Sequence, residues 1–523
     1  MTDPRLVSPA RPMNLTEVYL LRRLSEGRGE RTALIVDDPV AGVSSFTYAQ
    51  VAAEASRYGH ELRAHGLGLE DRIFIILEDG LPWVAAFFGA LAIGATVMFL
   101  NPASTSDELS FYLADSRAKA VITSRAVAPK IPAERPHLRS VVVVDDASTR
   151  AALDRHPSEL ELAPTTEEDF AIWLYSSGST GAPKAAVHRA LDFVYNTERY
   201  PREVLGQNEN DVTVSVPKLF FGYATGSNLL FTFYYGGKVV LFPDKPRPDR
   251  LFELVERHGA TILVNVPTMI AQMADLFEKI DPKPNLSTLR IVTSAGEALP
   301  PELYERWRRG PGPEILDGIG SAEMFHVFIS ARPGEVVKGS LGTLVSGYEA
   351  RIVRPDGTDA DVGEVGSLWI SGDSAAAFYW QRAETSRDTL RGRTVATKDQ
   401  FVRDANGHFW YRGRADDLMK IGGRWLAPQE IEDALTRHPA VSEAGAAAFT
   451  HDGLQKPMAF VVLRRGEEVS TELLREHVAK LTEPYKAPRF IEIVQTLPRG
   501  DRDKLDRKAL KEHAEAAAKK RQL

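Results

Sequence analysis

The chain has 523 residues, of which 43% are hydrophobic and 26% charged, and its formal net charge is −7 at pH 7. This length predicts two or more domains, and the composition is typical of globular proteins rather than of disordered, collagen-like or membrane chains. The negative net charge argues against general electrostatic binding of nucleic acid. Because the chain contains no cysteine, disulfides, thiolate metal sites and a cysteine nucleophile are excluded.

The N-terminal region gives no indication of a targeting segment. Residues 1–20 contain acidic residues and three prolines, but no apolar core of signal-peptide length. The most apolar stretch, residues 83–100, approaches the length of a membrane span. Its two glycines and its helix-then-strand pattern favour a buried element instead. We therefore expect no membrane association and a cytoplasmic location.

Short β-rich runs alternate with helical patterns through the first two thirds of the chain. The runs begin at Arg72, Ala120, Ser140, Ala260 and Arg290. Residues 252–260 and 301–310 place apolar side chains at helical spacing and reach a glycine at or near their ends, as surface helices do. This alternation predicts an α/β fold with helices layered around largely buried sheets.

The sequence changes character from about Tyr348 onward. Asp-Gly and Val-Gly turn signals between alternating apolar positions predict hairpins, so we expect a β-rich subdomain at about residues 340–415. Beyond it, a helical pattern at 429–438, a strand at 457–463 and terminal helices predict a small α+β C-terminal domain. The predicted division is thus a large N-terminal domain of layered sheets and helices, residues 1–415, and a C-terminal domain, residues 416–523.

The segment with the strongest chemical signal reads YSSGSTGAPKAAVH and spans residues 175–188, directly after an apolar strand. Glycines let backbone N–H groups converge on an anion, hydroxyls add donors, and a lysine supplies a mobile positive charge. The spacing differs from that of a Walker motif, and a flexible Ser/Gly loop is the alternative. The predicted phosphate-binding residues are Ser176, Ser177, Gly178, Ser179, Thr180, Gly181 and Lys184.

This segment resembles the phosphate loop of the adenylate-forming superfamily, which comprises acyl-CoA synthetases, aryl-acid ligases and luciferases. Further segments of that family follow in its order, and the resemblance extends from about residue 30 to residue 512. It implies that Glu323 acts in catalysis and holds magnesium, and that Lys504 is the catalytic lysine. It also implies a set of nucleotide-binding residues: Gly296, Glu297, Ala298, Asp317, Gly318, Ile319, Asp399 and Arg414. Taken singly, such residues are also compatible with solvated acids or surface ion pairs.

The resemblance implies the chemistry as well. ATP, Mg²⁺ and coenzyme A are the expected cofactor and co-substrates. A carboxylate that attacks the α-phosphate of ATP must overcome repulsion between anions, so magnesium, Lys504 and the phosphate loop would neutralise the developing charge. The C-terminal domain is expected to be mobile about a hinge at Asp416, and Gly422 and Gly423 are expected to line the coenzyme A tunnel.

Three segments, residues 216–228, 290–300 and 318–328, resemble benzoate-CoA ligases more than fatty acyl-CoA or acetyl-CoA synthetases. A compact pocket for a small aromatic carboxylic acid is implied. His326 is a candidate to contact the carboxylate or a ring substituent, and core packing is the alternative reading of the aromatic residues. The expected substrate-binding residues are Phe220, Tyr223, Gly226, Ala295, Gly320 and His326.

Several positions depart from the family pattern. Ala185 and Ala322 replace a glycine and a threonine, Lys398 replaces the glycine of the ribose motif, and residues 500–503 read GDRD before Lys504. These changes leave three alternatives to coenzyme A ligation open: delivery of the adenylate to a carrier protein, delivery to another small nucleophile, or a non-catalytic binding homologue. We favour coenzyme A ligation by a monomer or homodimer.

Overall fold

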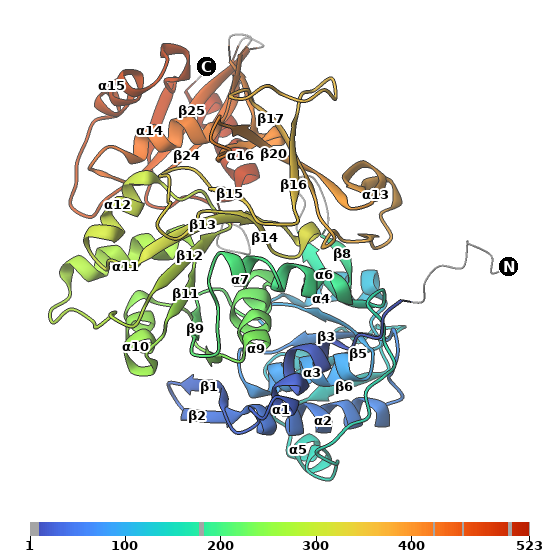
Figure 1. Ribbon diagram of the computed structural model, residues 1–523. Helices are drawn as coiled ribbons and strands as arrows, with labels where there is room; N and C mark the ends of the chain where they lie inside the picture. The colour runs from blue at the N-terminus through green and yellow to red at the C-terminus, as the bar shows by residue number, and fades with distance from the viewer. Residues whose placement is uncertain (1–9, 177–182, 422–423, 452–453, 500–504, 522–523) are drawn as a thin grey trace.

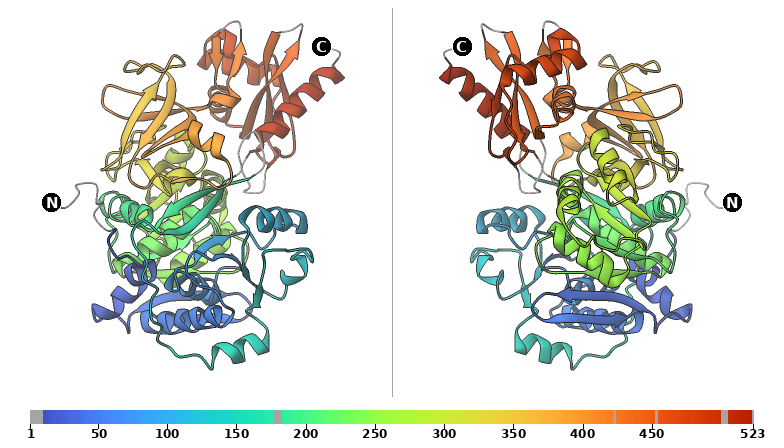
Figure 2. Two further views of the ribbon diagram at one scale, coloured as in Figure 1. Left: turned by 90° about the vertical axis from the view of Figure 1, so that its right-hand side faces the viewer. Right: turned by 90° about the vertical axis from the view of Figure 1, so that its left-hand side faces the viewer.

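The computed structural model describes residues 10–176, 183–421, 424–451, 454–499 and 505–521. Two large sheets with their helices form the N-terminal part of the chain, and a smaller domain at the C-terminal end packs above them beside a β-rich region (Figures 1 and 2). The predicted α/β fold, with a large sheet-based N-terminal region and a small C-terminal domain, is confirmed. Among the described residues, no helix combines the length and apolar character that a membrane crossing requires.

The first sheet has nine strands and is mostly parallel. Buried runs at residues 262–265 and 291–295 form two of its central strands, close to the starts predicted from the sequence. In spatial order its strands are β15 (Thr343–Leu344), β14 (Val327–Ser330), β13 (Glu314–Gly320), β12 (Ile291–Ala295), β11 (Ile262–Asn265), β9 (Val212–Ser215), β10 (Lys238–Leu241), β1 (Thr32–Asp38) and β2 (Gly42–Thr47).

The second sheet has seven strands, and its central parallel members are almost wholly apolar because both of its faces are covered. The runs predicted at Arg72, Ala120 and Ser140 are confirmed as strands of this sheet. In spatial order its strands are β18 (Phe378–Tyr379), β8 (Lys184–Arg189), β7 (Phe170–Ser176), β4 (Thr96–Phe99), β3 (Arg72–Ile76), β5 (Ala120–Thr123) and β6 (Ser140–Val143).

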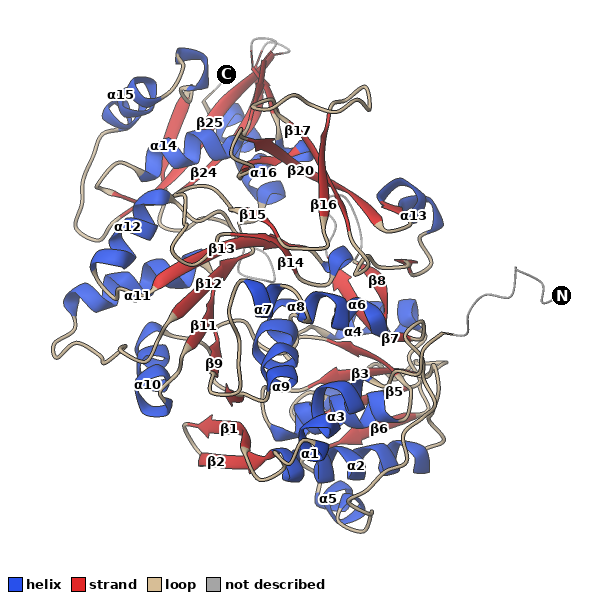
Figure 3. Cartoon of the chain, in the orientation of Figure 1, coloured by secondary structure: helices blue, strands red, loops and turns tan. Residues whose placement is uncertain are grey.

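Helices flank these sheets, as the blue and red colouring of Figure 3 shows. The helices of the N-terminal region are α1 (Arg22–Ser25), α2 (Tyr48–Ala64), α3 (Leu81–Ala92), α4 (Ser106–Ser116), α5 (Ala147–Leu153), α6 (Ala190–Thr197), α7 (Tyr200–Glu203), α8 (Gly222–Ala224), α9 (Phe231–Tyr235), α10 (Pro248–His258), α11 (Pro267–Lys279), α12 (Pro301–Arg309) and α13 (Ala383–Thr389). The π-helical segments are η1 (Glu17–Leu21) and η3 (Thr225–Leu230), and the short 3-10 turns are η2 (Ala128–Lys130), η4 (Ala322–Met324) and η5 (Ala415–Asp417).

Local chemistry explains where several helices begin and end. The Thr47 hydroxyl accepts from the Gln50 backbone N–H, and the Gln50 side chain accepts from the Thr47 N–H, which completes a capping box at the start of α2. Pro248 begins α10, and Gly259 ends it in a left-handed conformation at φ +62°. The apolar stretch at 83–100 is confirmed as most of helix α3 followed by strand β4, both buried.

The main core lies between the two large sheets. It joins α2, α3 and α9 to strands of both sheets, and the rings of Phe88 and Phe233 stack with centroids 5.7 Å apart. Helices α2 and α3 approach so closely that an added Cβ at Gly89 would lie 2.6 Å from the Ala55 carbonyl oxygen. Helices α10, α11 and α12 cover the outer face of the nine-stranded sheet.

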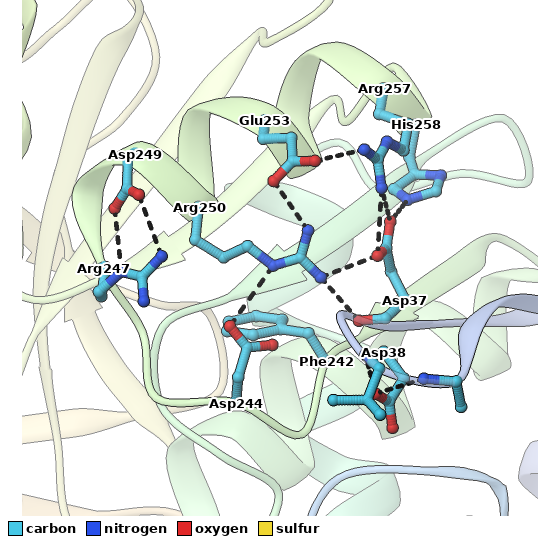
Figure 4. Close-up of polar contacts among 12 residues, drawn as sticks. Asp37, Asp38, Phe242, Asp244, Arg247, Asp249, Arg250, Glu253, Arg257 and His258 are labelled. Carbon is cyan, nitrogen blue, oxygen red and sulfur yellow. Dashed lines mark hydrogen bonds and ion pairs between the residues drawn. The ribbon is translucent and has the colours of Figure 1, made fainter.

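A buried charge cluster fastens β1 to α10 (Figure 4). Asp37 is 1% exposed and accepts hydrogen bonds from Arg250 Nη2 at 2.8 Å, Arg257 Nη1 at 3.0 Å and His258 Nε2 at 2.6 Å. Burial alone would raise the pKa of Asp37, but these hydrogen bonds outweigh it and lower the pKa to about 2. The first strand and α10, more than 200 residues apart in the chain, are thereby held together.

The remaining strands form three smaller sheets. The five-stranded sheet comprises β16 (Glu349–Val353), β17 (Gly366–Ser371), β19 (Leu390–Arg391), β20 (Thr394–Arg403) and β21 (Phe409–Arg414). Nearer the C-terminus lie a two-stranded sheet, β22 (Met419–Ile421) and β23 (Arg424–Leu426), and a three-stranded sheet, β24 (Val441–His451), β25 (Leu454–Leu463) and β26 (Phe490–Ile493). The accompanying helices are α14 (Pro428–Thr436), α15 (Thr471–Leu481), η6 (Pro484–Lys486) and α16 (Arg507–Lys520).

Candidate active site

The predicted phosphate loop joins two neighbouring antiparallel strands. Strand β7 ends at Ser176 and β8 begins at Lys184, and these two residues face each other in the ladder. The Ser176 hydroxyl oxygen is buried and has no hydrogen-bond partner within the described part of the chain. The predicted loop residues Ser177, Gly178, Ser179, Thr180 and Gly181 lie outside the described residues. What the structure establishes is therefore the position of the two strand ends that carry the loop.

Lys184 lies beside the predicted magnesium ligand. Its Nζ atom is 3.8 Å from Oε1 of Glu323 and 3.8 Å from the centre of the Tyr379 ring. Burial lowers the pKa of Lys184, the charge of Glu323 opposes that change, and the nearby charges of Lys398 and Arg414 reinforce it. The amine is thus a desolvated cation of the kind that suits an anionic phosphate group.

The backbone around Glu323 is held by strand β8 and by the segment that precedes β18. His188 Nε2 donates to the Ala322 carbonyl oxygen at 2.6 Å, and His188 Nδ1 lies 3.0 Å from Oδ2 of the buried Asp192. On the other side, the Ala376 N–H donates to the Glu323 carbonyl oxygen at 2.8 Å. Glu323 therefore stands on a fixed turn, η4, next to the end of the phosphate loop.

The predicted nucleotide segments at 294–298 and 317–320 lie side by side. Strands β12 and β13 are parallel neighbours, with Ser294 opposite Asp317 and Ala295 opposite Gly318. Beyond β12 the chain turns at Gly296, whose φ of +92° favours glycine. The structure thus brings these strand ends together on the side of the nine-stranded sheet where β12 and β13 reach their carboxyl ends, which is where α/β folds bind ligands. Ala298, Ile319 and Gly320 belong to the same two segments.

Two acidic side chains of these segments are partly or fully enclosed. Burial raises the pKa of Asp317 to about 7, although the backbone N–H groups of Gly318 and Leu299 favour its ionised form. Glu297 accepts a hydrogen bond from the Thr268 hydroxyl at 2.8 Å. Asp317 is therefore an acid that changes its protonation near neutral pH.

The predicted ribose motif forms a pair across a hairpin. Asp399 of β20 lies opposite Arg414 of β21, and Arg414 Nη1 is 3.5 Å from Asp399 Oδ1. Arg414 also acts electrostatically on Lys184 and Tyr379, so this pair adjoins the Lys184 and Glu323 group. A carboxylate and a guanidinium at this place suit ribose hydroxyls and phosphate oxygens respectively.

Three of the predicted acid-binding residues lie against His326: Tyr223, Gly226 and Gly320. The His326 Nε2 atom lies 3.1 Å from the Tyr223 carbonyl oxygen and 2.9 Å from the Ser227 hydroxyl. An added Cβ at Gly226 would lie 2.4 Å from Cδ2 of this ring. Burial lowers the pKa of His326 to about 4, so the imidazole is neutral near pH 7. The Phe220 ring packs against that of Phe221, with centroids 4.6 Å apart, and against the main core.

Three predicted residues of the C-terminal region lie outside the described residues: Gly422, Gly423 and Lys504. Asp416, the predicted hinge, falls in the η5 turn that follows β21 and precedes the small sheets of the C-terminal region. Its role as a hinge stays a prediction.

The residues present fit ATP and its magnesium ion. Both contacts of Glu323 use Oε1, which leaves Oε2 without a partner within the described part of the chain. No cluster of three or more metal-binding side chains occurs among the described residues. Magnesium bound through one carboxylate together with substrate phosphates matches this arrangement, since Mg²⁺ is seldom held by protein ligands alone.

Comparison with known proteins agrees with this geometry. The family model for AMP-binding enzymes matches residues 21–380, and the model for the C-terminal domain of AMP-binding enzymes matches residues 430–504. The chain belongs to the AMP-binding enzyme family. The benzoate–CoA ligase of Thauera aromatica is 38% identical to this AMP-binding enzyme over 519 residues, which is 97% of each chain.

Solved structures show the same likeness. The anthranilate CoA ligase AuaEII, in complex with anthranoyl-AMP, superposes with a TM-score of 0.90 at 34% identity, over 97% of this chain and 98% of that one. A benzoate CoA ligase from Burkholderia xenovorans LB400 superposes with a TM-score of 0.86 at 36% identity, over 95% of this chain and 100% of that one. The resemblance to adenylate-forming ligases is confirmed along nearly the whole chain.

Sequence reasoning missed three residues that contact or support this site. Tyr379 donates to Glu323, and the buried pair His188 and Asp192 supports the Ala322 carbonyl. His188 stands at the end of the phosphate-loop segment, four residues before Asp192, where strand β8 passes into helix α6. Tyr379 belongs to an aromatic run at 378–380, but only the pairing of β18 with β8 places it beside the site.

Proposed function

We propose that this AMP-binding enzyme activates a small, benzoate-like aromatic carboxylic acid with ATP and transfers the acyl group to coenzyme A. In the first step a carboxylate oxygen attacks the α-phosphorus of ATP, the bond to pyrophosphate breaks, and an aryl adenylate forms. In the second step the coenzyme A thiolate attacks the adenylate carbonyl, the bond to AMP breaks, and aryl-CoA results. No protein nucleophile is consumed in either step.

The observation that carries this proposal is the convergence of three groups of residues. Lys184 contacts Glu323, the Arg414 of the Asp399 pair acts electrostatically on Lys184, and the enclosure around His326 lies three residues beyond Glu323. They occur in a chain that shares 38% identity with a benzoate–CoA ligase over 97% of both lengths. Desolvated positive charge would stabilise the anionic transition state of adenylate formation, and magnesium at Glu323 would neutralise phosphate charge.

The individual roles extend this proposal. Lys184 and the phosphate loop bind the ATP phosphates, Asp317 and the 296–298 turn bind the base side, and Asp399 and Arg414 bind the ribose. Tyr223, Gly226 and His326 enclose the ring of the acid. For the second step, the C-terminal domain, residues 416–523, rotates about Asp416 and presents Gly422 and Gly423 to coenzyme A. The cytoplasmic location and the monomeric or dimeric state stay predictions.

An exchange assay tests adenylation separately from transfer. Purified protein, ATP, Mg²⁺ and a panel of benzoates, without coenzyme A, should exchange radiolabelled pyrophosphate into ATP; addition of coenzyme A should then yield AMP and aryl-CoA. The absence of exchange across a broad panel would contradict the proposal and favour a non-catalytic homologue. Exchange without aryl-CoA formation would favour delivery to a carrier protein or another nucleophile.

Lys504 provides a second test, because it is assigned to only the first half-reaction. Lys504→Ala should suppress adenylate formation at least a hundredfold, the size of effect expected when one electrostatic group is removed from a transition state. It should leave thioester formation from supplied aryl adenylate within a few fold of the unsubstituted protein. Equal loss of both half-reactions would contradict this assignment.

A further inference from the structure

Tyr379 is buried between the two charged residues at the centre of the site. The side chain lies on β18 and is 1% exposed. Its hydroxyl donates to Oε1 of Glu323 at 2.7 Å, while its ring centre is 3.8 Å from the Nζ atom of Lys184. One side chain therefore contacts both the carboxylate and the amine.

The position of Tyr379 is fixed by the strand that also carries Lys184. Tyr379 pairs with Ala186 in the β18 and β8 ladder. The Ala377 N–H donates to the Val187 carbonyl oxygen at 2.9 Å, and the next hydrogen bond, from the Trp380 N–H to Ala185, measures 3.0 Å. Lys184 and Tyr379 are thus mounted on adjacent strands, so the distance between them is set by sheet geometry.

Glu323 has little backbone freedom left. Its turn is held at the Ala322 carbonyl by His188 and at its own carbonyl by the Ala376 N–H. What remains free is the carboxylate end of a flexible side chain, and a hydrogen bond to one oxygen restricts that end. Oε1 receives that bond from Tyr379, and Oε2 has no partner within the described residues.

The hydroxyl is a dependable donor. A tyrosine hydroxyl loses its proton only near pH 10. The phenol therefore stays protonated at neutral pH. Meanwhile the ring face attracts the Lys184 cation, whose separation of 3.8 Å from Oε1 is longer than a direct hydrogen-bonded ion pair.

We propose that Tyr379 is a positioning residue for adenylation: its hydroxyl holds Oε1 of Glu323 and leaves Oε2 for the Mg²⁺ that accompanies ATP, while its ring keeps Lys184 from closing onto the carboxylate. This inference rests on the proposed function, because it assigns Glu323 to the cation and Lys184 to the phosphates. Loss of the hydroxyl should therefore alter the dependence on Mg²⁺ more than any other property.

Tyr379→Phe tests the hydroxyl, because it retains the ring beside Lys184. We measure ATP binding by calorimetry without the acid, at a series of Mg²⁺ concentrations, and pyrophosphate exchange over the same series. Tyr379→Phe should raise the Mg²⁺ concentration for half-maximal binding and exchange about tenfold, the effect of one hydrogen bond to a charged group. The KM for the aromatic acid should change less than threefold.

Tyr348→Phe is the matched control. Tyr348 is also buried, and its hydroxyl bonds to Asn196 and Ser374 rather than to Glu323 or Lys184. It should leave the Mg²⁺ dependence unchanged, even if it lowers the thermal midpoint. If the two variants show the same Mg²⁺ dependence, whether both are unchanged or both are shifted tenfold, the proposal is overturned.

A double-mutant cycle checks that Tyr379 acts through Glu323. In a Glu323→Gln background, Tyr379→Phe should change the Mg²⁺ dependence of ATP binding less than twofold, and a full tenfold effect there would contradict the proposed route.

Tyr379→Leu, which also removes the ring, should weaken ATP binding at saturating Mg²⁺ beyond the effect of Tyr379→Phe. Equal binding by these two variants would refute the role of the ring. If the unsubstituted protein binds Mg²⁺ and ATP yet shows no acid-dependent exchange, the proposed function fails while the binding tests still decide the role of Tyr379.

Discussion

Single residues set the shape of the proposed acid pocket, and Gly226 is the most restrictive of them. An added Cβ would lie 2.4 Å from His326 Cδ2 and 3.1 Å from Phe325 Cζ, which requires His326 to move away from Ser227. Gly226→Ala should raise the KM for the aromatic acid at least tenfold and leave ATP binding within twofold, as acid-dependent kinetics and nucleotide titration would show. Gly222→Ala is the control, since the three atoms nearest to its Cβ would be Leu174 side-chain atoms at ordinary contact distances, the closest at 3.4 Å. Equal effects of the two substitutions would contradict the pocket assignment.

Asp317 is a second single residue with a testable effect, because it makes the stability of the folded protein depend on pH. Its folded-state pKa is about 7 against an ordinary value of 3.8, so the folded protein retains a proton that the unfolded chain has lost, and stability falls as pH rises between these values. Asp317→Asn removes the ionisation. The stability of the variant relative to that of the unsubstituted protein should therefore increase from pH 5 to pH 8, by up to about 3 kcal/mol. Thermal midpoints at the two pH values check this, and a pH-independent difference would argue against a buried titrating carboxyl.

At the scale of elements, the cluster of Figure 4 fastens the first strand to α10. The pKa of Asp37 is lowered to about 2, so its contribution is complete above 3.8 and is lost as pH falls through 2. Asp37→Asn should destabilise the folded protein by about 2 kcal/mol at pH 7 and by progressively less below pH 4. Asp38→Asn alters a half-buried carboxylate that accepts from the Val40 and Ala41 N–H groups but pairs with no charged side chain among the described residues, so it should cost under about 0.5 kcal/mol. Denaturation at pH 7 and pH 3 distinguishes the two.

The sequence predicted those elements that local interactions determine, and it did not predict those that depend on contacts between distant parts of the chain. Continuous apolar runs at 120–123 and 140–143 gave strands with the predicted starts, because such runs carry their signal locally. The two-residue strand β18 carries no such signal, and only its pairing with β8, almost 200 residues earlier, brings Tyr379 to Glu323. Motifs therefore predicted Lys184 and Glu323 as site residues, whereas their contacts with Tyr379 and His188 arise from long-range topology.

At the scale of the whole molecule, two ion pairs between described residues join the C-terminal region to the helices of the nine-stranded sheet. Arg437 Nε lies 3.2 Å from Glu302 Oε1 on α12, and Arg464 Nη1 lies 3.6 Å from Asp275 Oδ1 on α11. These side chains are 38–45% exposed, so each pair contributes little and is screened by salt. Together they favour the observed arrangement of the two regions only weakly, which suits a domain proposed to rotate during the reaction.

Charge reversal tests whether these ion pairs favour the observed arrangement of the two regions. Arg437→Glu should shift the equilibrium away from the observed arrangement by about twofold to fivefold, the range expected for an exposed pair, and Arg437→Glu with Glu302→Arg should restore it. Because the natural chain has no cysteine, thiols introduced by Val40→Cys and Leu481→Cys, both at exposed positions, can carry dyes for energy-transfer measurement. The difference between Arg437→Glu and the unsubstituted pair should vanish at 1 M salt, where the Debye length is about 3 Å. A shift that persists at high salt, or that the double reversal does not restore, would show that packing rather than charge holds the two regions together.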